Sequence, residues 1–328
     1  MIRSAFLLAL MAGMSGTALH AEPLQFVYKG NGCDGRGRIA RYEGVIGRKL
    51  DGISDFFAKD SWKSMLSDAD WALGCWQAMP RAMAIGVPLI VNGASLRGAA
   101  NGDYDDQFRK LGSLLVAKGQ ASAILRLGWE FNGGWYPWKA DRDPAAFRGA
   151  FRRVVGVLRS TPGQDFRIVW NPTANAGSVA PQDLWPGDDV VDVIGLDFYN
   201  QSWRRQDADP QVRWQNYLTG NYGLNWLTRF AAAHRKPIAI PEWGTGTRPD
   251  KHGFGDDPSF IHNMAAWMRA HDVLFHSYWD YTAPDYDSTM SAGKFPQTLA
   301  AYKAEFGGAL RPPRRGEGRR RGSPDGPF

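Results

Sequence analysis

The stretch that decides the fold is residues 123–135, AILRLGWEFNGGW, in which a short apolar run leads into the carboxylate of Glu130. Residues 237–244, PIAIPEWG, repeat this arrangement around Glu242. A short apolar run bounded by glycine or proline is typical of a buried parallel strand. We therefore predict that each stretch forms a strand that delivers a glutamate at its carboxyl end.

Similar runs alternate with helical patterns along the chain, and this alternation indicates parallel βα units. Eight strands are expected, at residues 41–46, 71–76, 88–91, 123–128, 167–170, 191–197, 237–241 and 274–278. Helices are expected at residues 103–118, 144–159, 225–234 and 258–271. Eight such units predict an α/β fold, a single-domain (β/α)8 TIM barrel. A doubly wound open sheet is the alternative.

The two ends of the chain differ in composition from its body. Residues 1–21 hold a positive charge, an apolar run and then small residues, which predicts a cleaved signal peptide; an uncleaved anchor is the alternative. Residues 22–308 are expected to form the barrel domain. Residues 309–328 are rich in Pro, Gly and Arg, which predicts a disordered basic tail, either solvated or in contact with an anionic polysaccharide or surface.

Charge and cysteine content narrow the class of protein. The net charge is +6, and most of the excess lies in the tail, so we expect no nucleic-acid partner. No apolar run after the leader is long enough for a transmembrane helix. After export, Cys33 and Cys75 can form one disulfide or remain two buried thiols. We expect a monomer that requires neither a metal nor another cofactor.

In a (β/α)8 barrel the active site lies where strands end and βα loops begin. The polar and aromatic residues at such positions are Glu43, Gln77, Asn92, Glu130, Asn171, Asp197 with Tyr199, Glu242, and Trp279 with Asp280. Glycoside hydrolysis requires two carboxyl groups, one to protonate the leaving oxygen and one to attack the anomeric carbon. The charge of Glu242 would raise the pKa of Glu130 and keep it protonated until it is used. A strand-end ion pair is the alternative role for either glutamate.

Together these motifs resemble glycoside hydrolase family 26, the β-mannanase family within a clan of retaining barrel enzymes. The resemblance spans roughly residues 41–281. It implies that Glu130, after strand 4, is the acid/base and that Glu242, after strand 7, is the nucleophile. The family pattern around the acid/base is matched by Arg126, Glu130, Asn132, Gly133, Trp135 and Trp138.

The resemblance also suggests roles for the residues around the two glutamates. Tyr199, in Asp197-Phe198-Tyr199-Asn200, is expected to orient the nucleophile, and Trp279 is expected to lie beneath the sugar that is cleaved. The expected substrate-binding residues are Arg126, Trp129, Asn132, Trp135, Trp138, Asn171, Tyr199 and Trp279. A core position for Tyr199 or Trp279, or a turn role for Asn171, is the alternative.

One residue departs from the family pattern. Trp129 precedes the acid/base where family mannanases carry a histidine, which favours a more apolar subsite or a differently substituted sugar. We therefore expect a secreted or periplasmic retaining β-glycosidase, an endo-acting enzyme on mannan or a related β-glycan. Its partner would be a polysaccharide or oligosaccharide. The alternatives are the same chemistry on a bacterial exopolysaccharide and a non-catalytic glycan-binding barrel.

Overall fold

The computed structural model describes residues 21–174 and 179–308. The expected basic tail and all but the last residue of the expected signal peptide lie outside these ranges. No helix in the described part of the chain is long and apolar enough to cross a membrane.

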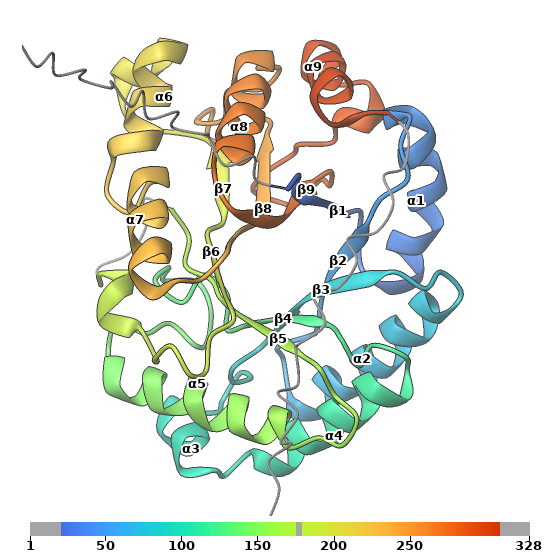
Figure 1. Ribbon diagram of the computed structural model, residues 1–328, viewed down its shortest axis with the longest axis vertical. Helices are drawn as coiled ribbons and strands as arrows, with labels where there is room; N and C mark the ends of the chain where they lie inside the picture. Colours follow the sequence, from blue (N-terminus) through green and yellow to red (C-terminus); the bar gives the residue numbers. More distant parts are fainter. Residues whose placement is uncertain (1–20, 175–178, 309–328) are drawn as a thin grey trace, which may run out of the picture.

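Eight parallel strands form a nearly closed barrel (Figure 1). They are β1 (Leu24–Tyr28), β2 (Gly52–Phe56), β3 (Ala82–Val87), β4 (Ile124–Leu127), β5 (Arg167–Trp170), β6 (Val193–Gly195), β8 (Ile238–Thr245) and β9 (Val273–Trp279). The short strand β7 (Phe198–Asn200) follows β6 and pairs with the later part of β8. On one side, β1 pairs with β9. On its other side, the backbone N–H of Asp51, the residue before β2, donates to the carbonyl of Gln25 in β1 at 3.0 Å. The predicted barrel is confirmed, and the open sheet is excluded.

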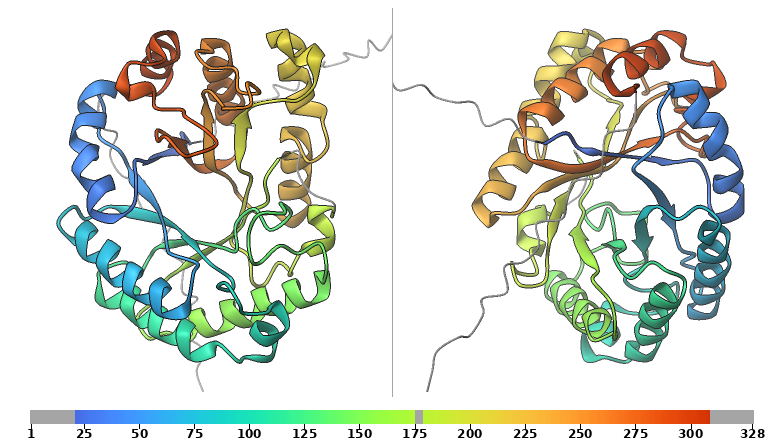
Figure 2. Two further views of the ribbon diagram at one scale, coloured as in Figure 1. Left: turned by 180° about the vertical axis from the view of Figure 1, so that it is seen from behind. Right: turned by 45° about the vertical axis from the view of Figure 1, so that its right-hand side comes forward.

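Helices surround the barrel on its outer face (Figure 2). They are α1 (Gly32–Ile46), α2 (Trp62–Gln77), α3 (Leu96–Asn101), α4 (Asp105–Ala117), α5 (Pro144–Arg159), α6 (Pro210–Thr219), α7 (Leu224–His234), α8 (Pro258–Ala270) and α9 (Pro296–Phe306). Three single turns of 3-10 helix also occur, η1 (Pro181–Leu184), η2 (Arg205–Ala208) and η3 (Met290–Ala292). Helix α5 begins as its sequence predicts, because the Asp143 side chain accepts the N–H of Ala146 and Pro144 occupies the first turn.

The first three predicted strands are wrong. Residues 41–46 lie in α1, residues 71–76 lie in α2, and residues 88–91 follow β3. A short apolar run does not distinguish a strand from the buried side of a helix, and in α1 the buried Ile39, Tyr42 and Ile46 recur at helical spacing. The other five predicted strands overlap β4, β5, β6, β8 and β9. Since three earlier strands replace the three wrong ones, Glu130 still follows the fourth barrel strand, and Glu242 lies in the seventh, β8.

Two side chains that the wrong strands placed at the barrel mouth lie elsewhere. Glu43 is buried in α1, where it accepts the N–H of Leu50 at 2.9 Å and pairs with Arg81 at 2.8 Å, close to the residues that lead into β2 and β3. Gln77 is exposed at the end of α2. Asn92 is exposed in the βα loop after β3, so it remains on the side of the barrel where the strands end.

A plug of apolar side chains fills the barrel beneath the mouth. It consists of Phe26, Ala84, Ile124, Val169, Val193, Ala239 and Phe275. Gly52 leaves room for this plug, because a Cβ there would lie 2.2 Å from the ring of Phe26. The residues at the next level of the barrel, where Phe56, Gly86 and Arg126 are in register, therefore lie above a closely packed layer of apolar side chains.

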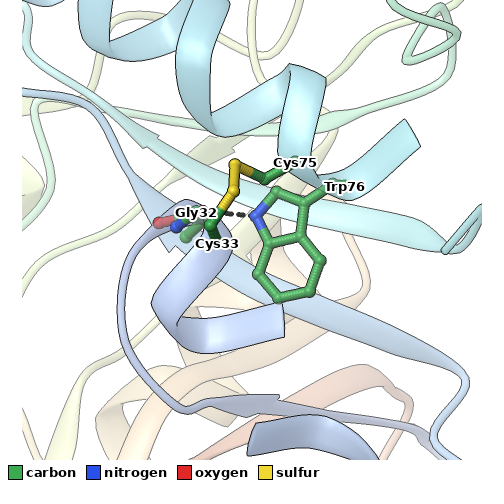
Figure 3. Close-up of a disulfide and its surroundings, with 5 residues drawn as sticks. Gly32, Cys33, Cys75 and Trp76 are labelled. Carbon is green, nitrogen blue, oxygen red and sulfur yellow. Dashed lines mark hydrogen bonds between the residues drawn. A yellow bond between two sulfur atoms is a disulfide. The ribbon is translucent and has the colours of Figure 1, made fainter. Parts of the chain in front are cut away.

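One disulfide joins the first two helices outside the barrel. Cys33 at the start of α1 pairs with Cys75 in the last turn of α2, with Cα atoms 5.0 Å apart (Figure 3). Beside it, the carboxylate of Asp55 in β2 accepts the indole N–H of Trp76 at 2.5 Å and the backbone N–H of Gly32 at 3.0 Å. Asp55 thus fixes both helices against the strand from which the chain enters α2.

Replacing both cysteines with alanine should lower the free energy of unfolding by about 4 kcal/mol, because the cross-link closes a loop spanning 42 residues in the unfolded chain. Urea unfolding followed by tryptophan fluorescence measures this loss. Wild-type protein in reducing buffer should lose the same stability, whereas the double variant should not respond to reductant. A loss below about 1 kcal/mol would contradict the expected role of the cross-link.

Candidate active site

Arg126 connects the strand ends that form the candidate site. Its fully buried guanidinium donates from Nε to Oδ1 of Asn171 at 2.7 Å, and from Nη2 to Oδ2 of Asp197 at 2.7 Å and Oε1 of Glu242 at 2.6 Å. Its carbon Cζ also lies 5.2 Å from the ring centre of Phe56. A buried guanidinium requires such compensation, since leaving its charge unpaired in the interior is costly. Arg126 therefore couples β4 to residues at the ends of β5, β6 and β8.

Glu242 accepts hydrogen bonds from two side chains, one on β4 and one on β7. Arg126 reaches Oε1, and the hydroxyl of Tyr199 donates to Oε2 at 2.9 Å. Tyr199 comes from β7, where it is in register with Gly244 of β8, so this short strand delivers the tyrosine next to the carboxylate. The two hydrogen bonds fix the plane of the carboxylate, and the guanidinium compensates its charge.

Glu130 sits on a tight turn after β4. Its φ of 53° is in the left-handed region, which is uncommon for a residue with a side chain and occurs often at functional sites. Gly128, two residues earlier, has a φ of 51°, and a Cβ there would lie 2.8 Å from Leu89. The backbone N–H of Glu130 donates to the carbonyl of Asn171 at 2.7 Å. This turn buries Trp129 and leaves Glu130 partly exposed as a residue.

The electrostatic surroundings of Glu130 favour its protonated form. Burial raises the pKa of Glu130 to about 8, and the negative charge of Glu242 acts in the same direction. The indole N–H of Trp135, which donates to Oε2 of Glu130 at 2.8 Å, opposes this rise. Burial also raises the pKa of Asp197, but Asp197 has a direct ion pair with Arg126 that opposes the change. The surroundings of Glu130 thus favour a carboxylic acid at neutral pH.

Trp279 and Tyr28 form an aromatic floor on the other side of the mouth. Their rings stack with centroids 4.2 Å apart and planes inclined by 18°. The residues that follow them form a buried ion pair, in which Nζ of Lys29 lies 2.6 Å from Oδ2 of Asp280. Trp279 remains partly exposed, so it can offer a face to a ligand.

Five of the expected substrate-binding residues are buried, namely Arg126, Trp129, Asn132, Trp138 and Asn171. Arg126 donates to Asn171, and the side chain of Asn132 exchanges two hydrogen bonds with the backbone of Thr173, at 2.8 and 2.9 Å. Trp138 is fully buried and donates to the carbonyl of Trp129 at 2.7 Å. These contacts hold the loops around Glu130 together, and the expected role of the five residues in substrate binding stays a prediction.

Trp129, which precedes Glu130, is packed among aromatic side chains. Its indole N–H donates to the hydroxyl of Tyr136 at 2.9 Å, and its ring packs on Phe56 and Trp138. Trp135, Tyr199 and Trp279 are the expected binding residues that keep accessible surface.

Two aromatic residues of the mouth, Tyr28 and Phe56, were not among the predicted site residues. Tyr28 ends β1 and Phe56 ends β2, and neither strand was predicted from the sequence. The sequence signal for β1 was the apolar run Phe26-Val27-Tyr28, which is followed by Gly30. Phe56 follows Ser54 and Asp55, and this polar pair conceals the strand. In the described part of the chain, no group of three or more His, Cys, Asp or Glu residues could hold a metal ion.

Comparisons with known proteins agree with this arrangement. The sequence model for glycosyl hydrolase family 26 matches residues 108–237. The β-1,3-xylanase TXYA of a Vibrio species is 24% identical over 212 residues, which cover 61% of this chain and 41% of that protein. A mannan endo-1,4-β-mannosidase of Bifidobacterium adolescentis is 27% identical over 180 residues, covering 50% of this chain and 18% of that protein. The chain thus spans less than half the length of these two relatives.

The fold is similar to that of a solved mannanase. The structure of mannanase man26 from Bacillus subtilis superposes with a TM-score of 0.59 at 15% identity, covering 87% of this chain and 85% of that one. This likeness concerns the barrel fold. Together with the matching sequence model, it confirms the resemblance to glycoside hydrolase family 26 that the motifs predict.

Replacing Trp135 with phenylalanine should raise the pKa of Glu130 above its value of about 8, because the lost indole N–H stabilises the ionised carboxylate. A 13C NMR titration of the side-chain carboxyl groups measures this change without requiring activity. Trp71→Phe, which alters an exposed indole on α2, is the matched control and should leave the titration of Glu130 unchanged. An unchanged or lowered pKa in the Trp135 variant would refute the interaction.

Asp280→Asn should lower the free energy of unfolding by about 3 to 5 kcal/mol, because it leaves Lys29 without its buried partner. The double change Lys29→Met and Asp280→Leu should recover most of this loss. The matched control is Asp143→Asn, at a surface pair with the exposed Arg97, which should leave urea unfolding unchanged. Equal effects of the Asp280 and Asp143 substitutions would contradict a structural role of the buried pair.

Proposed function

Because this chain resembles glycoside hydrolase family 26, we propose that it is a retaining β-glycoside hydrolase in which Glu130 is the acid/base and Glu242 the nucleophile. The observation that carries this proposal is the different environment of the two glutamates. Glu242 accepts hydrogen bonds from Arg126 and Tyr199, whereas burial and the charge of Glu242 keep Glu130 protonated. A double displacement needs one carboxylate and one carboxylic acid at the same time.

In the first step, an oxygen of Glu242 bonds to the anomeric carbon as the bond from that carbon to the leaving oxygen breaks. Glu130 transfers its proton to the leaving oxygen, so the products are a glycosyl-enzyme and a released sugar chain. Arg126 and Tyr199 are positioning residues in this step, since they hold the attacking carboxylate in one plane.

The second step depends on the loss of the negative charge of Glu242 in the first step. Once Glu242 is esterified it no longer carries a negative charge, so its contribution to the raised pKa of Glu130 is lost. Glu130, now ionised, takes a proton from water, and the water oxygen displaces Glu242 from the anomeric carbon. The sugar is released with its original anomeric configuration, and both glutamates return to their starting forms.

For the substrate, we propose a β-linked polysaccharide cut within the chain. Relatives of this chain include a mannan endo-1,4-β-mannosidase and a β-1,3-xylanase, so both glycans are candidates. The buried Trp129 favours the xylan, because its only polar atom is used by Tyr136 and it offers no hydrogen bond where family mannanases carry histidine. Export is part of the proposal, supported by the leader sequence and by the Cys33–Cys75 disulfide.

Glu242→Ala should reduce the release of oligosaccharides from β-1,3-xylan or β-1,4-mannan by on the order of 10⁴-fold. Azide should restore turnover of an activated aryl glycoside by this variant and yield the glycosyl azide, since the small anion can occupy the space of the carboxylate. Glu305→Ala, which removes a carboxylate on α9 outside the mouth, is the control and should retain wild-type rates. A Glu242→Ala variant that hydrolyses at the wild-type rate would overturn the assignment.

A further inference from the structure

Trp203 is an exposed indole at the mouth that the proposed chemistry does not use. It follows β7 and is the most exposed large apolar side chain in the described ranges, with 58% of its surface accessible. The others above 40% are Trp135, beside Glu130, and Trp71, on α2. An exposed indole presents a flat apolar ring with a polar N–H at its edge, which suits a ligand that has both apolar and polar groups.

The indole of Trp203 is held in place by neighbouring side chains. Its ring stacks on the imidazole of His252, with centroids 5.2 Å apart and planes inclined by 22°. The guanidinium carbon of Arg248 lies 5.2 Å from the Trp203 ring centre. Arg248 in turn donates to the side chains of Gln201 at 2.9 Å and Asp250 at 3.1 Å. An aromatic ring ordered before binding loses little conformational entropy when a ligand stacks on it.

The side chains that hold Trp203 in place come from two loops, one after β7 and one after β8. The N–H of Ser202 donates to the carbonyl of His252 at 3.0 Å, and Gln201 forms an antiparallel bridge with Gly253. One loop follows β7, which carries Tyr199, and the other follows β8, which carries Glu242. Trp203 is four residues beyond Tyr199, so at most about 14 Å of backbone separates them. The indole therefore lies on the rim of the same mouth.

The polar groups beside the indole are charged. Arg248 is paired with Asp250 and lies 3.9 Å from Asp285, and His252 lies 3.4 Å from Asp250. Arg204 and Arg205, which follow Trp203, are exposed. The flat apolar C–H face of a sugar matches an aromatic ring, and its hydroxyl groups can bind the polar side chains beside it.

We propose that Trp203, supported by His252 and Arg248, is a distal sugar-binding platform that holds one sugar unit of the β-glycan away from the bond being cleaved. This inference rests on the proposed function, because it assigns the platform to the same substrate chain. Its consequence is a preference for long substrates. A short substrate that occupies only the site around Glu130 and Glu242 does not reach the platform.

The test compares a hexasaccharide with an aryl disaccharide, using β-1,3-xylo- or β-1,4-manno-oligosaccharides according to which polysaccharide the wild type hydrolyses. Trp203→Ala should lower the ratio of kcat/KM between the two substrates roughly five- to tenfold, the effect of losing one aromatic contact. Trp203→Phe should restore most of the ratio. Trp71→Ala, at the exposed indole on α2, should leave the ratio unchanged. Equal losses on both substrates, or no loss, would overturn the platform.

A binding measurement separates failure of the platform from failure of the proposed chemistry. In affinity gel electrophoresis, the Glu242→Ala protein should be retarded by soluble glucomannan or β-1,3-xylan, and adding Trp203→Ala should weaken this retardation several-fold. Dextran, an uncharged α-linked glucan, should not retard either protein. Retardation that is independent of Trp203, or equally strong on dextran, would refute the inference. If the wild type hydrolyses no glycan but Trp203 governs retardation, the proposed chemistry fails and the platform stands.

Discussion

The positive charge of Arg126 lies inside the barrel, and the arrangement of the mouth depends on how that charge is compensated. A lone guanidinium would be expensive to bury, so Asp197 and Glu242 lie within ion-pair distance and Asn171 accepts a further hydrogen bond. Because these partners come from different strands, the ion pairs fix the relative positions of the strand ends. The same contacts orient Glu242, so the residue that stabilises the mouth also prepares it for chemistry.

Three carboxyl groups gather around this single guanidinium, and they cannot all be ionised at low cost in a buried site. Asp197 and Glu242 are directly paired with Arg126, whereas the side chain of Glu130 accepts a hydrogen bond from the neutral indole of Trp135. These contacts favour the protonated form at Glu130, in agreement with its raised pKa of about 8. The division of the two glutamates that we propose, into acid and nucleophile, is consistent with this charge balance, and Gly128 permits the turn that brings Glu130 to the site.

The sequence predicted the barrel and the strands from β4 onward, because in those strands an apolar run ends on a polar residue. It failed at β2, since GISDF at residues 52–56 contains a glycine that makes room for Phe26 inside the barrel and an aspartate that binds the helices outside it. It also assigned Trp138 to substrate binding, whereas the loop after Glu130 folds back and buries that ring. Sequence order identifies which residues reach the mouth, but the packing of the loops decides which of them remain accessible.

The mouth is divided into an aromatic part and a polar part, and this division restricts the ligands that fit. Strands β9, β1 and β2 contribute Trp279, Tyr28 and Phe56, with Tyr28 packed on both neighbours. Strands β4 to β8 contribute the ion-pair network around Arg126. A sugar ring has an apolar face and a hydroxyl-bearing edge, and so complements both parts at once. A phosphate or carboxylate ligand would instead meet the surplus of carboxyl groups, and an alkyl chain would leave the polar part without partners.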